Sequence, residues 1–454
     1  WPGWRGPHHN GSGVDQGLKL IDDPNRAKLV WTSDVELPGA RVADGRKVVP
    51  KETGQISGGF ASPVVAAGRV YLYYYLPSGK QYDHRLNEKH APAGGFGPEK
   101  WAIDTDDVIH CFDAATGKTL WKRVFPGRGM NYNLFNTGGP CNLTVLGAQG
   151  RVYAIGSGAR VYCVDAVTGE PVWESTDLPR HALMEELRAE CIKKNVIPQY
   201  NRDMSSTPVL AEGVLVVSDF LGFKVQSPLE QFNWGDGCGL VGLDAATGKK
   251  LWHLPQTLGN WASPVVWEQG DKSYVISGAG DGKIYCIEPR TGKIVWETAI
   301  GKNNSTVSIG AGYLIANGGS EAAQAVCYRL TLAGPEKVWD LPASFGYEAD
   351  STPVIYRGHA YIVGKTARQL ACVELATGKV IGQVPFAGGG FMLAAEGRLW
   401  VDTELGHDGD AVYLFNADPK DFRPLGGAWP APNATSYMNV IMPAYAEGRM
   451  YLRS

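Results

Sequence analysis

The sequence predicts an all-β fold, an eight-bladed β-propeller, because one phrase recurs at a regular spacing. The phrase consists of an apolar strand, an acidic turn with Thr-Gly, and a second strand that ends on tryptophan. Its clearest copy is Ile284–Trp296 (IYCIEPRTGKIVW). Other copies end at Trp121, Trp173 and Trp252, the last of which lies 44 residues before Trp296. A period of this length, made of short strands, is typical of a β-propeller.

The residue types of the phrase explain its parts. The acid that opens the turn can accept hydrogen bonds from nearby backbone N–H groups, and the glycine tolerates a positive φ. A tryptophan at one fixed place in each repeat is expected to pack between neighbouring blades. Two degenerate copies, Leu370–Gly382 and Ala325–Trp339, have lost the tryptophan and the Thr-Gly respectively. The turn acids are Asp113, Asp165, Glu288 and Glu374.

A second kind of hairpin precedes each phrase, and two hairpins make a four-stranded blade. Lys28–Thr32 matches the last strand of a blade, with Trp31 in the tryptophan place, and Asn439–Leu452 matches a first hairpin. We therefore expect the N- and C-terminal segments to share the closing blade, and residues 1–454 to form a single domain. The turn-rich segment from Trp1 to Val30 is expected to lie along the outside of the ring. First hairpins are expected near Ser62, Leu143, Thr207, Ser263, Val307, Thr352, Met392 and Met442.

Composition excludes two classes of protein and favours export. The net charge of −3 gives no sign of a nucleic-acid surface. No run of about 18 apolar residues occurs, so no membrane span is expected. The sequence starts at Trp1 instead of Met, which we interpret as removal of a signal peptide from a secreted or periplasmic protein.

The eight cysteines do not form an obvious disulfide framework. Five of them repeat at one position of the phrase, so we expect them to be small buried thiols, too far apart to be bridged. These five are Cys111, Cys163, Cys286, Cys327 and Cys372. Cys141, Cys191 and Cys238 lie outside this register, and a bridge between two of them stays open.

Long links interrupt the repeats at particular places. The main rim insertions are Pro77–Asp106, Leu178–Ser206 and Asp219–Gly239, whereas links inside hairpins are short. Because strands alternate in direction, long links should emerge at one face and tight turns at the other, and binding groups gather on such links. Within the second insertion, His181–Asn195 has apolar residues at helical spacing and predicts a short amphipathic helix over the rim.

Amide, carboxylate and aromatic side chains cluster just before the first strands, a composition that suits a sugar ligand. In the first insertion, a histidine could serve as general base, with Arg or Tyr stabilising an enolate-like charge, as β-elimination of a polysaccharide requires. The candidate ligand-binding residues are Asn131, Asn133, Asn136, Arg202, Asn260, Trp261, Asn303, Glu348, Asp350, Tyr437 and Asn439. The candidate catalytic residues are His84, His90, Arg85, Tyr132 and Tyr347.

Two acidic clusters are candidate calcium-binding sites. His407, Asp408 and Asp410 place oxygen ligands close together, although Asp-Gly-Asp is also ordinary turn chemistry. The acidic residues Asp104, Asp106 and Asp107 allow the same two interpretations.

The repeated [AV]-x-D-A-x-T-G-K-x-x-W phrase resembles the pyrroloquinoline-quinone (PQQ)-type propeller repeat, from Lys28 to Leu452. That family includes quinone-dependent alcohol and glucose dehydrogenases with eight blades and the non-catalytic lipoprotein of the outer-membrane-protein assembly machine. It also includes exported propellers that open with a phrase like Trp1–Pro7 (WPGWRGP). The dehydrogenases typically carry a Cys-Cys pair over the quinone, and some carry a C-x-x-C-H. This sequence has neither, so PQQ is not expected.

Three hypotheses for function follow. The first is an exported propeller whose loop-rich face binds a carbohydrate and cleaves it by lyase-type His/Tyr chemistry. The second is a non-enzymatic scaffold for protein partners, as the resemblance to the assembly lipoprotein implies. The third, quinone-dependent oxidation, lacks its expected cysteine motifs.

Overall fold

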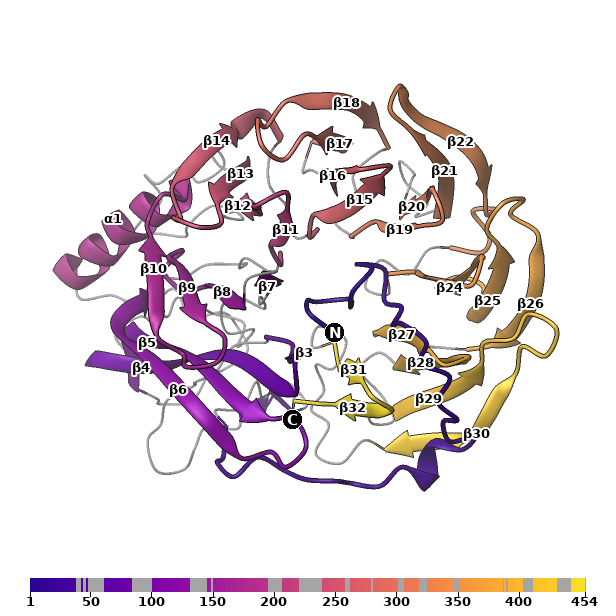
Figure 1. The fold of residues 1–454 in the computed structure, drawn as a ribbon, viewed down its shortest axis with the longest axis horizontal. Coiled ribbons are helices and arrows are strands. Elements are labelled where there is room, and N and C mark those ends of the chain that lie inside the picture. The colour runs from indigo at the N-terminus through magenta and orange to yellow at the C-terminus, as the bar shows by residue number, and fades with distance from the viewer. Residues whose placement is uncertain are drawn as a thin grey trace. The chain divides into compact units, whose positions relative to one another are not determined.

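The computed structural model describes residues 1–37, 42–43, 46–47, 61–83, 100–130, 145–147, 150–194, 206–219, 239–257, 262–278, 281–300, 306–317, 325–346, 352–386, 388, 391–402, 411–430 and 442–453. The chain divides into two compact units. Figure 1 labels the strands of both units in chain order. Unit 1 comprises Trp1–Val30 and Trp261–Ser454, and unit 2 comprises Trp31–Asn260.

The fold consists of consecutive four-stranded antiparallel sheets, seven of which lie within the described residues. In unit 2 they are β3 (Val64–Ala66), β4 (Arg69–Asp83), β5 (Lys100–Asp113) and β6 (Thr119–Met130); β7 (Val145–Gly147), β8 (Arg151–Ile155), β9 (Val161–Asp165) and β10 (Pro171–Ser175); and β11 (Val209–Ala211), β12 (Val214–Asp219), β13 (Gly239–Asp244) and β14 (Lys250–Leu254). Unit 2 also contains the short pair β1 (Val42–Ala43) and β2 (Arg46–Lys47), the helix α1 (Pro179–Lys194) and the 3₁₀ turn η3 (Pro255–Thr257).

Unit 1 repeats the same pattern. Its sheets are β15 (Val265–Gln269), β16 (Lys272–Gly278), β17 (Lys283–Ile287) and β18 (Ile294–Ala299); β19 (Ser308–Gly310), β20 (Tyr313–Asn317), β21 (Ala325–Thr331) and β22 (Gly334–Asp340); β23 (Val354–Tyr356), β24 (His359–Gly364), β25 (Gln369–Glu374) and β26 (Val380–Pro385); and β27 (Met392–Ala395), β28 (Arg398–Asp402), β29 (Ala411–Asn416) and β30 (Pro424–Pro430). The hairpin of β31 (Ala444–Ala446) and β32 (Arg449–Tyr451) follows, and η1 (Pro24–Arg26) lies near β30.

The predicted starts of all eight first hairpins agree with the structure, from β3 to β31. In the eighth repeat, however, the described residues contribute only the hairpin β31–β32. Lys28–Thr32, predicted as the last strand of that blade, is not a strand, because no described strand pairs with it. The count of eight blades and the single domain over 1–454 therefore stay predictions.

The cores lie between neighbouring sheets. In unit 1, Trp296 of β18 and Ile276 of β16 belong to one buried cluster with Leu314 and Ala316 of β20, in the next sheet. In unit 2, Tyr153 and Leu243 share a cluster across the boundary between the second and third sheets. First strands of neighbouring sheets also approach one another inside each unit. Apolar burial between sheets is thus what holds each unit together.

The acidic turns form as the sequence predicts. Asp113 Oδ1 accepts hydrogen bonds from the N–H groups of Ala115 and Thr116, at 3.1 and 2.8 Å, and from the Thr116 hydroxyl at 2.8 Å. Asp165 and Asp244 do the same in their own sheets. These bonds to an ionised acceptor hold the pKa of Asp113 below its usual range.

The tryptophan of each phrase reaches the turn of the following sheet. Trp121 Nε1 donates to the carbonyl oxygen of Ala166 at 3.2 Å, and its ring covers Gly169, where a Cβ would overlap it. The same relationship joins Trp173 to the turn at Gly248 in unit 2, and Trp339 to the turn at Gly378 in unit 1. Positive φ and this close approach together require glycine there.

Trp31 confirms part of a prediction although its segment is not a strand. Its Nε1 donates to the carbonyl oxygen of Ala114 at 3.1 Å, and its ring covers Gly117. It therefore occupies the tryptophan place in front of the first sheet of unit 2.

The five in-register cysteines are buried free thiols, as predicted. In four of the phrases the cysteine stands opposite the tryptophan of the same sheet, as with Cys111 and Trp121. Burial raises the pKa of Cys111 to about 12. Cys191, on α1, is also buried and free, whereas Cys141 and Cys238 lie outside the described residues.

The segment Trp1–Arg26, here called the N-terminal strap, does not run along the outside of its unit as expected. Arg5 Nη2 donates to the Pro353 carbonyl at 2.6 Å, and Asn10 Nδ2 donates to the Ile309 carbonyl at 2.9 Å. Gly13 N donates to the Ala394 carbonyl at 2.8 Å. The strap thus crosses the first strands β19, β23 and β27, where its glycines permit close backbone approach.

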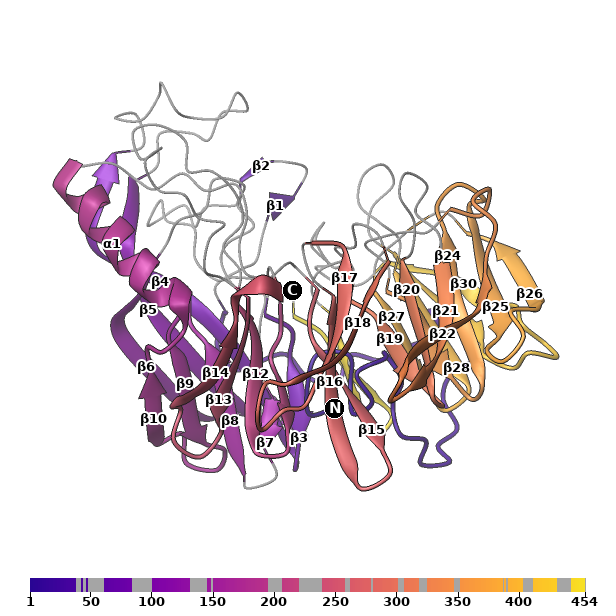
Figure 2. The ribbon, with the colours of Figure 1, turned by 90° about the horizontal axis from the view of Figure 1, so that it is seen from above.

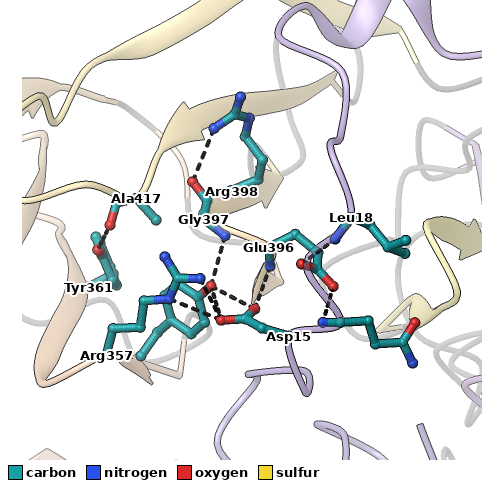
Figure 3. A network of polar contacts seen from close by, with 10 residues as sticks. Asp15, Leu18, Arg357, Tyr361, Glu396, Gly397, Arg398 and Ala417 are labelled. Carbon is teal, nitrogen blue, oxygen red and sulfur yellow. Dashed lines mark hydrogen bonds and ion pairs between the residues drawn. The ribbon is translucent and has the colours of Figure 1, made fainter.

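Farther along, the strap crosses the tight hairpin turns of unit 1 (Figure 3). Asp15 Oδ2 accepts from Arg357 Nε and Nη2 at 2.9 and 2.7 Å, and Asp15 Oδ1 accepts from the Glu396 N–H at 2.6 Å. The Glu396 carboxylate in turn accepts the N–H groups of Gln16 and Leu18, at 2.6 and 3.0 Å. Charged acceptors on the strap (Asp15) and on the hairpin turn (Glu396) therefore fix this part of the strap.

Candidate functional site

Most of the residues that the sequence nominated lie outside the described ranges, so their candidate roles stay predictions. This holds for the catalytic candidates His84, His90, Arg85, Tyr132 and Tyr347. It holds equally for the ligand-binding candidates Asn131, Asn133, Asn136, Arg202, Asn260, Trp261, Asn303, Glu348, Asp350, Tyr437 and Asn439, and for the metal candidates His407, Asp408 and Asp410.

The structure does describe the edge of unit 2 from which the long links depart, here called the long-link edge. In the first sheet, the end of β4 pairs with the start of β5 at Asp83 and Lys100, and the end of β6, Met130, pairs with Asp104 of β5. In the third sheet, β12 ends at Asp219 opposite Gly239. Within each of these sheets the long links depart from one edge, and the first link is shorter than the predicted Pro77–Asp106, because β4 continues to Asp83 and β5 begins at Lys100.

Helix α1 lies at this edge and confirms the predicted amphipathic helix. Met184, Leu187 and Cys191 are buried on one side. Arg188 Nε lies 2.6 Å from Asp104 Oδ1 of β5, and His181 Nδ1 lies 2.8 Å from the Gly158 carbonyl oxygen. Figure 2 shows α1 beside the extended ends of β4 and β5. The helix is thus braced against two sheets of its unit.

A buried carboxylate joins the first two sheets at the same edge. Asp107 Oδ1 accepts from the Tyr73 hydroxyl and the Ser157 hydroxyl, both at 2.7 Å. Asp107 Oδ2 accepts from the Tyr162 hydroxyl at 2.8 Å, and the Ser157 hydroxyl lies 2.8 Å from Thr105 Oγ1. Burial nevertheless raises the pKa of Asp107. Because both carboxylate oxygens are occupied by protein donors, this group braces the two sheets.

A second buried carboxylate, Asp219, meets the start of α1. Asp219 Oδ2 accepts from the Arg180 backbone N–H at 2.8 Å, and Asp219 Oδ1 lies 3.3 Å from Arg180 Nε. Both side chains are 0% exposed. Burial raises the pKa of Asp219, against the opposing effects of Arg180 and His253. This ion pair lies where two of the three main insertions begin.

The carboxylates of the acidic cluster Asp104, Asp106 and Asp107 all make contacts with other residues of the protein. Asp104 pairs with Arg188, Asp106 Oδ1 accepts from the Gly127 N–H at 2.8 Å, and Asp107 is enclosed by hydroxyl groups. Within the described ranges no group of three or more His, Cys, Asp or Glu residues is arranged to hold a metal ion.

Among the helices of the described chain, none is long and apolar enough to cross a membrane.

Sequence reasoning missed Arg180 and Asp219, and it named Asp107 only as part of an acidic cluster with a calcium or a turn role. Arg180 immediately precedes the predicted helix, and Asp219 was noted only as the start of a link. The available signal was a carboxylate at the end of an apolar strand (VLVVSD, Val214–Asp219), which has to find a partner if it is buried. Asp107, in contrast, lies inside β5, directly before its apolar stretch Val108–Phe112.

Comparison with known proteins places the chain in a family. A sequence model described as outer membrane protein assembly factor BamB matches residues 105–383, more than half of the chain. The chain belongs to this PQQ-like β-propeller family. The predicted resemblance is thereby confirmed. A search of curated protein sequences returned no match.

Solved structures resemble this one in fold. A quinohemoprotein alcohol dehydrogenase, ADHIIG from Pseudomonas putida HK5, is 13% identical, with a TM-score of 0.52 over 89% of this chain and 68% of that one. BamB from Moraxella catarrhalis is 14% identical, with a TM-score of 0.43 over 78% of this chain and 95% of that one. At such identities the likeness to the dehydrogenase concerns the fold alone.

Proposed function

We propose that this protein is a non-enzymatic scaffold that binds a protein partner at the long-link edge of unit 2. Membership of the BamB family supports a scaffold function, because the family is named after an assembly factor and its name states no enzymatic reaction. We further propose that the chain is exported and that its repeats form an eight-bladed propeller.

The observation that carries the proposal is the bracing of α1. One side of the helix is buried against unit 2, and its polar groups are used in contacts with Asp104 and Gly158. The opposite side is presented to solvent on a rigid support. It consists of Ala182, Glu186, Ala189, Ile192 and Lys193. Such a supported, mixed apolar and charged face suits recognition of another protein better than it suits proton transfer.

Photo-crosslinking tests this proposal directly. A photoreactive residue replaces Ile192 on α1, which is 46% exposed, and in a matched control it replaces Val167, which is 59% exposed in the tight β9–β10 turn. We expect a discrete adduct with one protein of the producing cell from position 192 and none from position 167. Equal labelling at both positions, or no adduct at position 192, would remove the support for a docking surface here.

The carbohydrate hypothesis can be tested with the same preparation. The carbohydrate hypothesis rests on residues outside the described ranges, so it stays a prediction. The hypothesis that calcium binds near Asp408 and Asp410 stays a prediction for the same reason. A panel of acidic and neutral polysaccharides is incubated with the protein, and unsaturated uronate and new reducing ends are measured. Cleavage of any of them contradicts the non-enzymatic proposal.

The described cysteines do not support the quinone hypothesis. The six described cysteines lie singly in buried positions, so none of them supplies the adjacent pair that the dehydrogenases carry over PQQ. We therefore propose no role for PQQ. Addition of PQQ and calcium with a dye acceptor is the corresponding assay.

A further inference from the structure

The Arg180–Asp219 pair leaves hydrogen-bonding capacity unused in the interior of unit 2. A guanidinium carries five N–H donors. Arg180 Nε approaches Asp219, but Nη1 and Nη2 have no hydrogen-bond partner in the described part of the chain. The side chain is 0% exposed, so bulk water does not reach these donors. Buried donors without acceptors destabilise a fold, and native proteins normally satisfy them with water or a ligand.

An independent observation marks the same place. Ser206 is 1% exposed, and its hydroxyl also has no hydrogen-bond partner among the described residues. The pairing of β11 with β12 ends at Val209 and Val216, and continuing its register by three residues along both strands brings Ser206 level with Asp219. Unsatisfied polar atoms of Arg180, Asp219 and Ser206 therefore lie at the same end of the third sheet.

We propose that Arg180, with Ser206 and the first turn of α1, forms a binding subsite for one small carboxylate anion. The inference is independent of the proposed scaffold function. The outer edge of a guanidinium, formed by Nη1 and Nη2, matches the two oxygens of a carboxylate in a bidentate arrangement. The Ser206 hydroxyl supplies a further donor. The N-terminal end of a helix also favours a negative charge, and α1 begins at Pro179.

Asp219 limits the affinity of this subsite instead of contributing to it. Its carboxylate positions Arg180 by accepting the backbone N–H at 2.8 Å, but its negative charge lies next to the incoming anion. Replacing it with asparagine keeps an acceptor for that N–H and removes the charge. If Arg180 and Asp219 only brace the fold, Asp219→Asn should not increase the binding of an anion. If Arg180 forms an anion subsite, Asp219→Asn should increase it.

The test measures binding of sodium formate and sodium acetate to the full chain, by calorimetry and by the thermal unfolding midpoint, with sodium chloride at equal ionic strength as reference. The wild-type protein should respond to the carboxylates and not to chloride. Asp219→Asn should bind about tenfold more tightly, because a like charge is removed beside the anion. Arg180→Gln should abolish the response, and Ser206→Ala should weaken it while leaving unfolding in chloride unchanged.

Several outcomes would overturn the proposal. They are the absence of any response in the wild type, a response that survives in Arg180→Gln, and an Asp219→Asn protein that binds no more tightly than the wild type. If Arg180→Gln does not fold, Ser206→Ala and Asp219→Asn decide the question, because neither removes the guanidinium. Inorganic sulfate, added in a parallel titration, tests shape: a site for planar carboxylates should bind it more weakly than formate.

Discussion

The indole N–H of Trp121 donates a hydrogen bond to the carbonyl oxygen of Ala166, in the turn of the next sheet, at 3.2 Å. The Tyr71 hydroxyl donates to the same oxygen at 3.0 Å. Tyr153 and Trp173 repeat this arrangement on the Ala245 carbonyl, each at 3.1 Å. Two aromatic side chains of one sheet thus hold one carbonyl of the following sheet.

Substitution of the glycine below the tryptophan ring should be costly. In Gly169→Ala the new methyl group would overlap the Trp121 ring, and φ is +71°, so overpacking adds about 1–3 kcal/mol to the backbone penalty. Gly213→Ala is the matched control, since φ there is +79° but nothing lies within 4 Å. It should lose only about 1–2 kcal/mol. Denaturant unfolding measures both; equal losses would contradict the role of the ring.

Removal of the strap contact should destabilise unit 1 in a pH-dependent way. The hydrogen bonds from Tyr356 and Arg357 hold the pKa of Asp15 below its usual value. Its contribution to stability is therefore present at neutral pH and is lost as pH falls through the folded-state pKa. Asp15→Asn should unfold at a lower temperature than wild type at pH 7, and the difference should shrink in acid.

Asp22→Asn is the control for this effect, since Asp22 forms only an exposed ion pair with Arg26. It should leave the unfolding midpoint almost unchanged across the same pH range. A midpoint shift that is equal for Asp15→Asn and Asp22→Asn would argue against a specific strap contact.

The described thiols should be unreactive in the folded protein. Burial raises the pKa of Cys111, Cys163 and Cys191 to about 12, so little thiolate forms at pH 8. In a Cys141→Ser/Cys238→Ser protein, which retains only the six described thiols, we expect slow modification by a thiol reagent until denaturant is added. Rapid labelling without denaturant would show that these positions open readily.

Trp31→Ala should destabilise unit 2 by removing a half-buried contact and its bond to the Ala114 carbonyl. The expected loss of unfolding free energy is smaller than the about 3–5 kcal/mol of a fully buried tryptophan. Trp31→Phe should retain part of the packing over Gly117 and lose less. If both variants unfold like the wild type, Trp31 has no structural role.

The repeats could be predicted from the sequence because their information is local. Strand, acidic turn and tryptophan recur within one phrase, so the sheets, their order and the buried cysteines followed directly. Trp296 shows where the pattern fails. It packs against the sheet whose phrase has lost Thr-Gly, and its indole N–H has no hydrogen-bond partner in the described residues.

The strap and the edge of unit 2 could not be predicted in the same way, because their partners are distant in sequence. Arg5 and Pro353 are 348 residues apart, and Arg180 and Asp219 belong to different repeats. Glycines in the strap indicated turns, whereas in the structure they permit backbone contact with β27. Composition alone does not distinguish these two uses.

The long separation between the strap and its binding strands has a consequence for biosynthesis. The carbonyl that Arg5 contacts, at Pro353, is made 348 residues after Arg5 itself. At about 5–20 residues per second, roughly 20–70 s elapse before the two can meet. Docking of the strap therefore has to follow the synthesis of β23 and β27, and the strap stays without these partners until then.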